Sequence, residues 1–84
     1  MSSSQELEFE VDQLRDVVLF ELKTAQGSVR RQLVRARNML WLVCTQLYDG
    51  RGGAREDVDI EKLWDMWKEA LNITFRVVAD LYVL

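Results

Sequence analysis

The 84-residue sequence contains no histidine, no proline and a single cysteine. Histidine is the side chain that most often acts as a general acid or base near neutral pH, and it is a common metal ligand. A single cysteine excludes an internal disulfide and any zinc site built from paired cysteines. Proline is the residue that interrupts helices most strongly, so its absence favours long continuous helices.

Long apolar runs are missing as well. No uninterrupted apolar segment approaches the roughly 20 residues that a helix needs to cross a bilayer. The first residues are rich in serine and then acidic, which is not the pattern of a secretory signal peptide. We therefore expect an intracellular, cytoplasmic protein with no membrane span.

The residues that remain for catalysis form no recognisable constellation. Cys44 lies at the edge of an apolar stripe, where a cysteine usually serves as a small hydrophobic side chain. Glu6 and Glu10 have the spacing of residues on one helix face, but the Glu-x-x-His motifs of di-metal helical bundles are absent. The sequence predicts no enzyme activity, no catalytic residue, no metal site, no cofactor and no small-molecule substrate.

Apolar residues make up 49% of the chain, and they recur every three or four residues in three segments, as in amphipathic helices. We predict helices at about residues 5–26, 28–49 and 58–82, with a flexible glycine-rich loop at 50–57. Gly27 is expected to end the first helix and Ser28 to cap the second. One glycine inside a helix costs only about 1 kcal/mol, so a continuous helix through Gly27 stays an alternative.

These elements predict a single all-α domain over residues 1–84, folded as a three-helix up-down-up bundle. A chain of this length buries only about 60–65% of the surface that it exposes when unfolded. Its apolar content, which includes three tryptophans, exceeds what three short helices usually hide. We therefore expect an antiparallel homodimer.

The predicted second helix carries Arg30, Arg31, Arg35 and Arg37 in its first half. A helix N-terminus bears partial positive charge, so cations there are unfavourable by about a few tenths of a kcal/mol each. Helix stability thus gives no reason for these arginines, and we expect them to meet acidic side chains, another protein or a polyanion. In an antiparallel dimer, this basic segment would face the acidic helix ends of the partner and fix the orientation.

The leading functional prediction is a protein–protein interaction module that forms homo-oligomers. Tryptophan is enriched among the residues that dominate binding at interfaces, and the second and third helices supply all three. The predicted interface consists of Val34, Leu40, Trp41, Cys44, Tyr48, Trp64 and Trp67.

The alternative is sequence-independent binding of double-stranded RNA. Arg31, Arg35, Asn38 and Leu42 form one straight row along the predicted helix, and paired rows could contact phosphates and 2′-hydroxyls. The opening Val29-Arg30-Arg31-Gln32-Leu33 and the layout of a long hairpin before a third helix resemble the small dimeric helical proteins of some insect viruses (nodaviruses). The resemblance implies a viral suppressor of RNA silencing that shields duplex RNA. The predicted contact residues are Arg30, Arg31, Arg35, Arg37 and Asn38.

Overall fold

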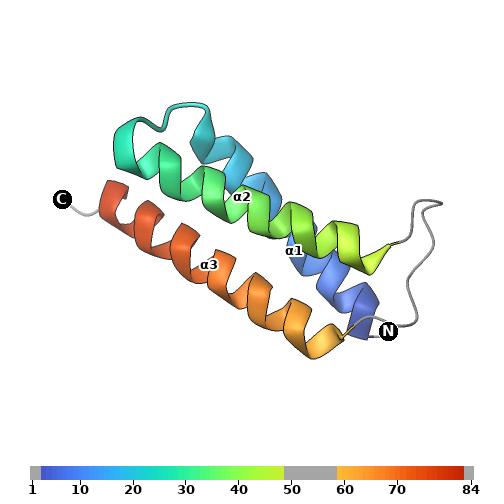
Figure 1. Ribbon diagram of the computed structural model, residues 1–84. Helices are drawn as coiled ribbons and strands as arrows, with labels where there is room; N and C mark the ends of the chain where they lie inside the picture. Colours follow the sequence, from blue (N-terminus) through green and yellow to red (C-terminus); the bar gives the residue numbers. More distant parts are fainter. Residues whose placement is uncertain (1–2, 49–58, 83–84) are drawn as a thin grey trace.

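The computed structural model describes residues 3–48 and 59–82, with side chains from residue 5 onwards. These residues form three α-helices and no strand. The helices are α1 (Ser3–Leu22), α2 (Gly27–Leu47) and α3 (Ile60–Tyr82). Helices α1 and α3 run in the same direction and α2 runs against both (Figure 1). The predicted all-α class is confirmed, and the packing is consistent with a bundle.

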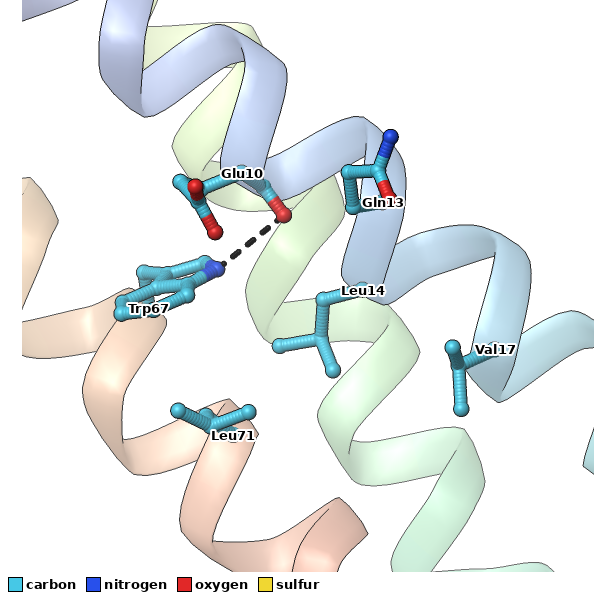
Figure 2. Close-up of a pocket in the computed structure, with 6 residues that line it drawn as sticks. All are labelled: Glu10, Gln13, Leu14, Val17, Trp67 and Leu71. Atoms are coloured by element: carbon cyan, nitrogen blue, oxygen red, sulfur yellow. Dashed lines mark hydrogen bonds between the residues drawn. The ribbon is translucent and has the colours of Figure 1, made fainter.

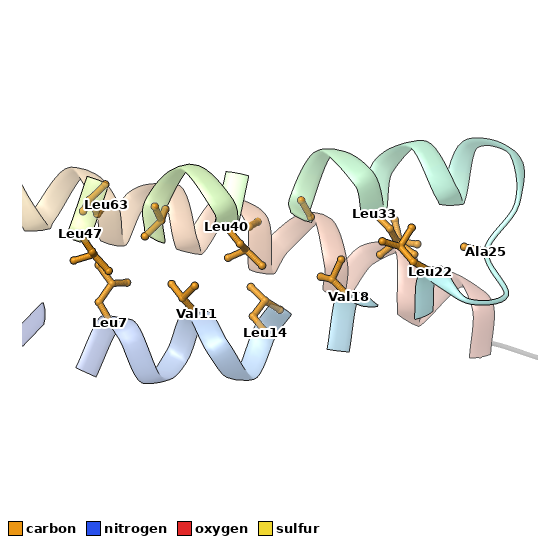
Figure 3. Close-up of a cluster of buried hydrophobic side chains, with 14 residues drawn as sticks. Leu7, Val11, Leu14, Val18, Leu22, Ala25, Leu33, Leu40, Leu47 and Leu63 are labelled. Carbon is orange, nitrogen blue, oxygen red and sulfur yellow. The ribbon is translucent and has the colours of Figure 1, made fainter. Parts of the chain in front are cut away.

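The core residues recur every three or four residues on α1 and α2 and every seven on α3, and Ala25 joins them from the connection between α1 and α2 (Figure 3). Its aliphatic members are Leu7, Val11, Leu14, Val18, Leu22, Ala25, Leu33, Ala36, Leu40, Val43, Leu47, Leu63, Ala70 and Val77. The polar side chain of Thr74 is also buried, and its hydroxyl donates a hydrogen bond to the carbonyl of Ala70 (2.8 Å). Helix α2 packs against both other helices, whereas α1 and α3 contact each other less extensively than either contacts α2.

The connection between α1 and α2 is a tight turn, so the hairpin is confirmed and the continuous helix is excluded. The prediction that Gly27 ends the first helix is wrong, because α1 ends at Leu22 and Gly27 is the first residue of α2. Beyond Leu22, the N–H groups of Thr24 and Ala25 both donate to the carbonyl of Glu21 (3.3 and 3.1 Å), as in the last turn of a helix. The side chain of Ala25 in this connection is buried in the core.

The N-cap of α2 differs from the one that the sequence predicts. Gln26, not Ser28, occupies the N-cap position of α2, and no side chain caps this end. The guanidinium of Arg30 reaches back across the turn and donates to the carbonyl of Leu22 (3.2 Å). At the start of α3, the carboxylate of Asp59 accepts from the N–H of Lys62 (3.2 Å), a favourable N-cap contact. The predicted loop at 50–57 lies outside the described residues.

The parallel course of α1 and α3 segregates charge along the bundle. Glu6 and Glu61 lie in the first turns of these two helices and therefore at the same end of the bundle. Lys23 and Arg30 lie at the opposite end, beside the turn that joins α1 and α2. That end is tied together by Tyr82, whose hydroxyl donates to the buried carboxylate of Glu21 (3.3 Å).

Substitution of Gly27 tests the geometry of the turn. Gly27 has φ of 63°, in the left-handed region, and nothing lies within 4 Å of a Cβ added there. We expect Gly27→Ala to lower the free energy of unfolding by about 1–2 kcal/mol, because L-residues in this region carry that cost. Urea denaturation followed by circular dichroism measures the change. Gly27→Asn should lose less, because asparagine tolerates positive φ better; equal losses would contradict the assignment to backbone conformation.

Candidate functional site

The exposed side of α2 carries the predicted RNA-contact residues, and we call this set the arginine surface: Arg30, Arg31, Arg35, Arg37 and Asn38. All five are exposed. Since the core side of α2 is formed by residues such as Leu33 and Leu40, the 3.6-residue period turns Arg31 and Asn38 away from the bundle. The structure therefore brings the predicted residues together on one helix.

No acidic side chain of the described residues forms an ion pair with the arginine surface. The part of the chain that the structure describes contains one ion pair, which joins Arg15 and Asp12 on α1 (3.6 Å). No acidic residue occurs between Glu21 and Asp49 in the sequence. The arginines of α2 thus present positive charge to solvent, apart from the hydrogen bond that Arg30 makes to a carbonyl at the end of α1.

The second half of the same helix is apolar on its outer side. Trp41 is 65% exposed and Leu42 is also exposed, whereas Val34 is half-buried. The hydroxyl of Thr45 donates to the carbonyl of Trp41 (2.9 Å) and so remains satisfied within the helix. An aromatic ring therefore lies one turn beyond Arg37, on the helix that carries the arginine surface.

A second surface lies where α1 and α3 meet. Two adjoining cavities of about 200 and 180 Å³ open between these helices. Both cavities are lined by Leu14, Val17 and Leu71, so they form one depression, which we call the α1–α3 groove (Figure 2). Its remaining lining residues are Glu10, Gln13, Trp67, Thr74, Phe75 and Val78.

One wall of the α1–α3 groove is held in place by Trp67. The indole N–H of Trp67 donates to the backbone carbonyl of Glu10 (3.2 Å), which ties α3 to α1 (Figure 2). The ring also packs edge-to-face against Trp64, with ring centroids 5.5 Å apart and an angle of 87° between the planes. Such aromatic pairs add about 0.5–1.5 kcal/mol beyond their buried area. Trp67 is thus a fixed, largely apolar wall.

The rims of the α1–α3 groove expose large apolar side chains. Val17 is 46% exposed and Phe75 is 72% exposed, and both line the groove. Phe20 follows Val17 by three residues on α1 and is 64% exposed. The ammonium of Lys23 lies 5.7 Å from the centre of the Phe20 ring, a cation–π contact. Apolar side chains at this density around a depression are typical of interaction sites.

The predicted interface residues do not form one surface in this chain. Leu40 is fully buried and belongs to the core of the chain itself. Trp41 is exposed on α2, whereas the others (Val34, Cys44, Tyr48, Trp64 and Trp67) are half-buried. Sequence reasoning missed Phe75 as a groove residue. In the sequence, Val17 and Phe20 widen the apolar stripe of the first helix. This widening is the signal that could have indicated a second apolar face on that helix.

Cys44 and Tyr48 lie near the acidic residues of α1. A hydrogen bond to Glu8, together with burial, raises the pKa of Tyr48 to about 12. Burial also raises the pKa of the Cys44 thiol, against a smaller opposing effect of Arg15. Since the thiolate is the reactive form of cysteine, these surroundings favour a packing role for Cys44.

Metal clusters and membrane-spanning helices are absent from the described residues. Over residues 3–48 and 59–82, no three side chains of histidine, cysteine, aspartate or glutamate come together as a metal site would require. None of the helices described is both long and apolar enough to traverse a bilayer.

Comparison of the chain with protein-family models, with curated proteins and with solved structures finds no match.

Proposed function

We propose that this protein acts by binding rather than by catalysis, as a helical module that associates with a second copy of itself. The observation that supports this proposal is the α1–α3 groove with its exposed apolar rim. Burial of apolar surface contributes about 25 cal/mol per Å², and small chains commonly gain stability by oligomerisation. A second copy supplies apolar surface of the same kind, so it is a chemically suitable occupant.

Sedimentation equilibrium tests self-association directly. The chain has a mass of 9.9 kDa, and we expect a species of twice that mass at micromolar concentration, dissociating on dilution. We expect the buried apolar area to supply most of the binding free energy, so the dimer should persist at moderate salt. A single 9.9-kDa species at tens of micromolar would contradict the proposal.

Binding of double-stranded RNA is the second candidate function, and the arginine surface favours it. The guanidinium groups there are exposed and no carboxylate of the described residues pairs with them. Arginine binds phosphate well because its planar fork donates two hydrogen bonds at once. Although the net charge of the chain is −3, the acidic residues of α1 and the arginines of α2 lie on separate helices. The local charge that duplex RNA would meet is therefore positive.

A titration of a fluorescent RNA duplex of about 20 base pairs tests this second candidate, and it is run at two salt concentrations. Contacts to phosphate release bound counterions, so we expect the affinity to fall steeply as salt rises. An unrelated duplex sequence should bind equally, because A-form RNA is recognised mainly through phosphates and 2′-hydroxyls. Absence of binding at tens of micromolar protein would dismiss RNA as the ligand and leave the arginines to protein contacts.

The two candidate functions use different parts of the molecule. The α1–α3 groove is formed by α1 and α3, whereas the arginine surface lies on α2. Pairing through the groove would leave the outer side of α2 free to bind. The two experiments therefore have independent outcomes.

A further inference from the structure

We infer that the two copies pair through the α1–α3 groove about a two-fold axis beside Val17, with the α1 helices antiparallel. Phe20 and Lys23 of each copy then lie over Gln13 and Glu10 of the other. This inference rests on the proposed self-association and specifies the residues that meet.

Helix α1 carries a second stripe of the kind that packs against another helix. Its members are Glu6, Glu10, Gln13, Val17 and Phe20, separated by four, three, four and three residues. This alternation places the side chains on one side of the helix. It is the sequence spacing of contact residues in pairs of helices that pack nearly parallel or antiparallel. The buried residues of α1, such as Leu7 and Val11, form a different stripe that α1 already uses within the chain. Glu10, Gln13 and Val17 of the second stripe line the α1–α3 groove, and Gln13, Val17 and Phe20 remain exposed.

The position of Val17 makes this stripe complementary to itself. At a rise of 1.5 Å per residue, Phe20 lies about 4.5 Å beyond Val17 and Gln13 lies about 6 Å before it. A two-fold axis at Val17 exchanges these directions, so Phe20 of one copy comes to the cavity beside Gln13 of the other. In a closed two-fold interface each such contact occurs twice.

The α1–α3 groove has the volume that this arrangement needs. The cavity beside Gln13 and Trp67 has a volume of about 200 Å³, and a cavity of about 150 Å³ in another protein holds benzene. The volume is therefore sufficient for a phenyl ring. On α3, Phe75 follows Leu71 in the same direction as Phe20 follows Val17, and Trp67 precedes it. Both helices thus place an exposed ring on one side of the axis, where the second cavity adjoins Phe75, and the cavity beside Gln13 and Trp67 lies on the other side.

Charge selects the antiparallel orientation. Lys23 follows the last residue of α1 and holds its ammonium 5.7 Å from the centre of the Phe20 ring, whereas Glu10 lies about one turn before Gln13, so the two-fold axis brings these opposite charges towards each other. Lys23 already sits beside the ring of Phe20 and would travel with it to the partner. A parallel pair would instead place Glu6 and Glu10 beside their own equivalents. Like charges set face to face disfavour that alternative.

Cross-linking of Val17→Cys tests the position of the axis. The variant is made in a Cys44→Ser background and treated with a short bismaleimide at the concentration at which sedimentation shows pairing. A residue on a two-fold axis meets its own copy, so we expect most of the chain to run as a covalent dimer. Leu19→Cys in the same background is the matched control, because Leu19 is exposed to a similar extent (42%) on the same helix but does not line the groove. It should stay monomeric.

A charge exchange provides a second readout. Lys23→Glu should weaken pairing about tenfold in sedimentation, and adding Glu10→Lys should restore it, because each pair would again join opposite charges. If the native chain sediments as a dimer but Val17→Cys cross-links no better than Leu19→Cys, this arrangement is overturned while self-association stands. If the native chain sediments as a monomer, both the arrangement and the proposed function fall.

Discussion

Leu40→Ala should lower the free energy of unfolding by about 2–5 kcal/mol, the range measured for leucine truncations in protein cores. Leu40 is fully buried in the middle of α2, the helix that packs against both others. Small domains are stable by only about 5–15 kcal/mol in total, so the loss is a large part of the whole. Urea denaturation followed by circular dichroism at a fixed protein concentration measures it.

Leu42→Ala is the matched control for this experiment. Leu42 lies two residues further along the same helix and is 43% exposed. The same atoms are removed, but no cavity forms, so we expect a loss of less than about 1 kcal/mol. Equal losses for the two variants would contradict the packing of α2, because they would mean that Leu40 is no better buried than Leu42.

Replacing Arg31 and Arg35 together by alanine should weaken binding of duplex RNA about a hundredfold. A hydrogen bond to a charged group contributes about 1.5–3 kcal/mol, and a loss of about 3 kcal/mol corresponds to two orders of magnitude in affinity. If each arginine meets one phosphate, the logarithmic salt dependence should also become shallower by about two. Fluorescence anisotropy at two salt concentrations gives both quantities.

The matched control replaces Arg15 and Arg76 by alanine. These residues are exposed on α1 and α3, so the double variant removes the same amount of charge from other helices. We expect its affinity to fall less than about threefold, because long-range electrostatic effects between exposed charges are screened at physiological salt. A hundredfold loss in this variant too would mean that RNA responds to overall charge, and the arginine surface would no longer be its binding site.

The helices were predictable because the sequence repeats with their period. The buried residues of α2, from Leu33 to Leu47, fall on the stripe that the sequence indicates. The end of α1 was not predictable from the same pattern. Gly27 is a strong local signal for a helix end, but α1 already ends at Leu22, and Ala25 in the connection is buried in the core. Tertiary packing therefore overrode the local signal.

The two surfaces differ in how far the sequence reveals them. The exposure of Arg31 and Arg35 follows from the helical period alone, so the arginine surface was predictable. The α1–α3 groove was not, because it arises where two helices distant in sequence approach each other only loosely. Leu40 shows the same limit: its place on an apolar stripe predicts burial, but it does not tell whether the same chain or a second copy covers it.

The hydrogen bond from Arg30 to Leu22 links the electrostatics of two helix ends. Judged by its own helix, Arg30 is a cation at a positively charged N-terminus and is unfavourable. Its guanidinium, however, reaches the last carbonyl of α1, where a helix carries partial negative charge and a cation is favourable. The two effects oppose each other, so the turn tolerates an arginine that neither helix alone would explain. Arg30 therefore serves the hairpin as well as the surface, and its loss would alter folding and binding together.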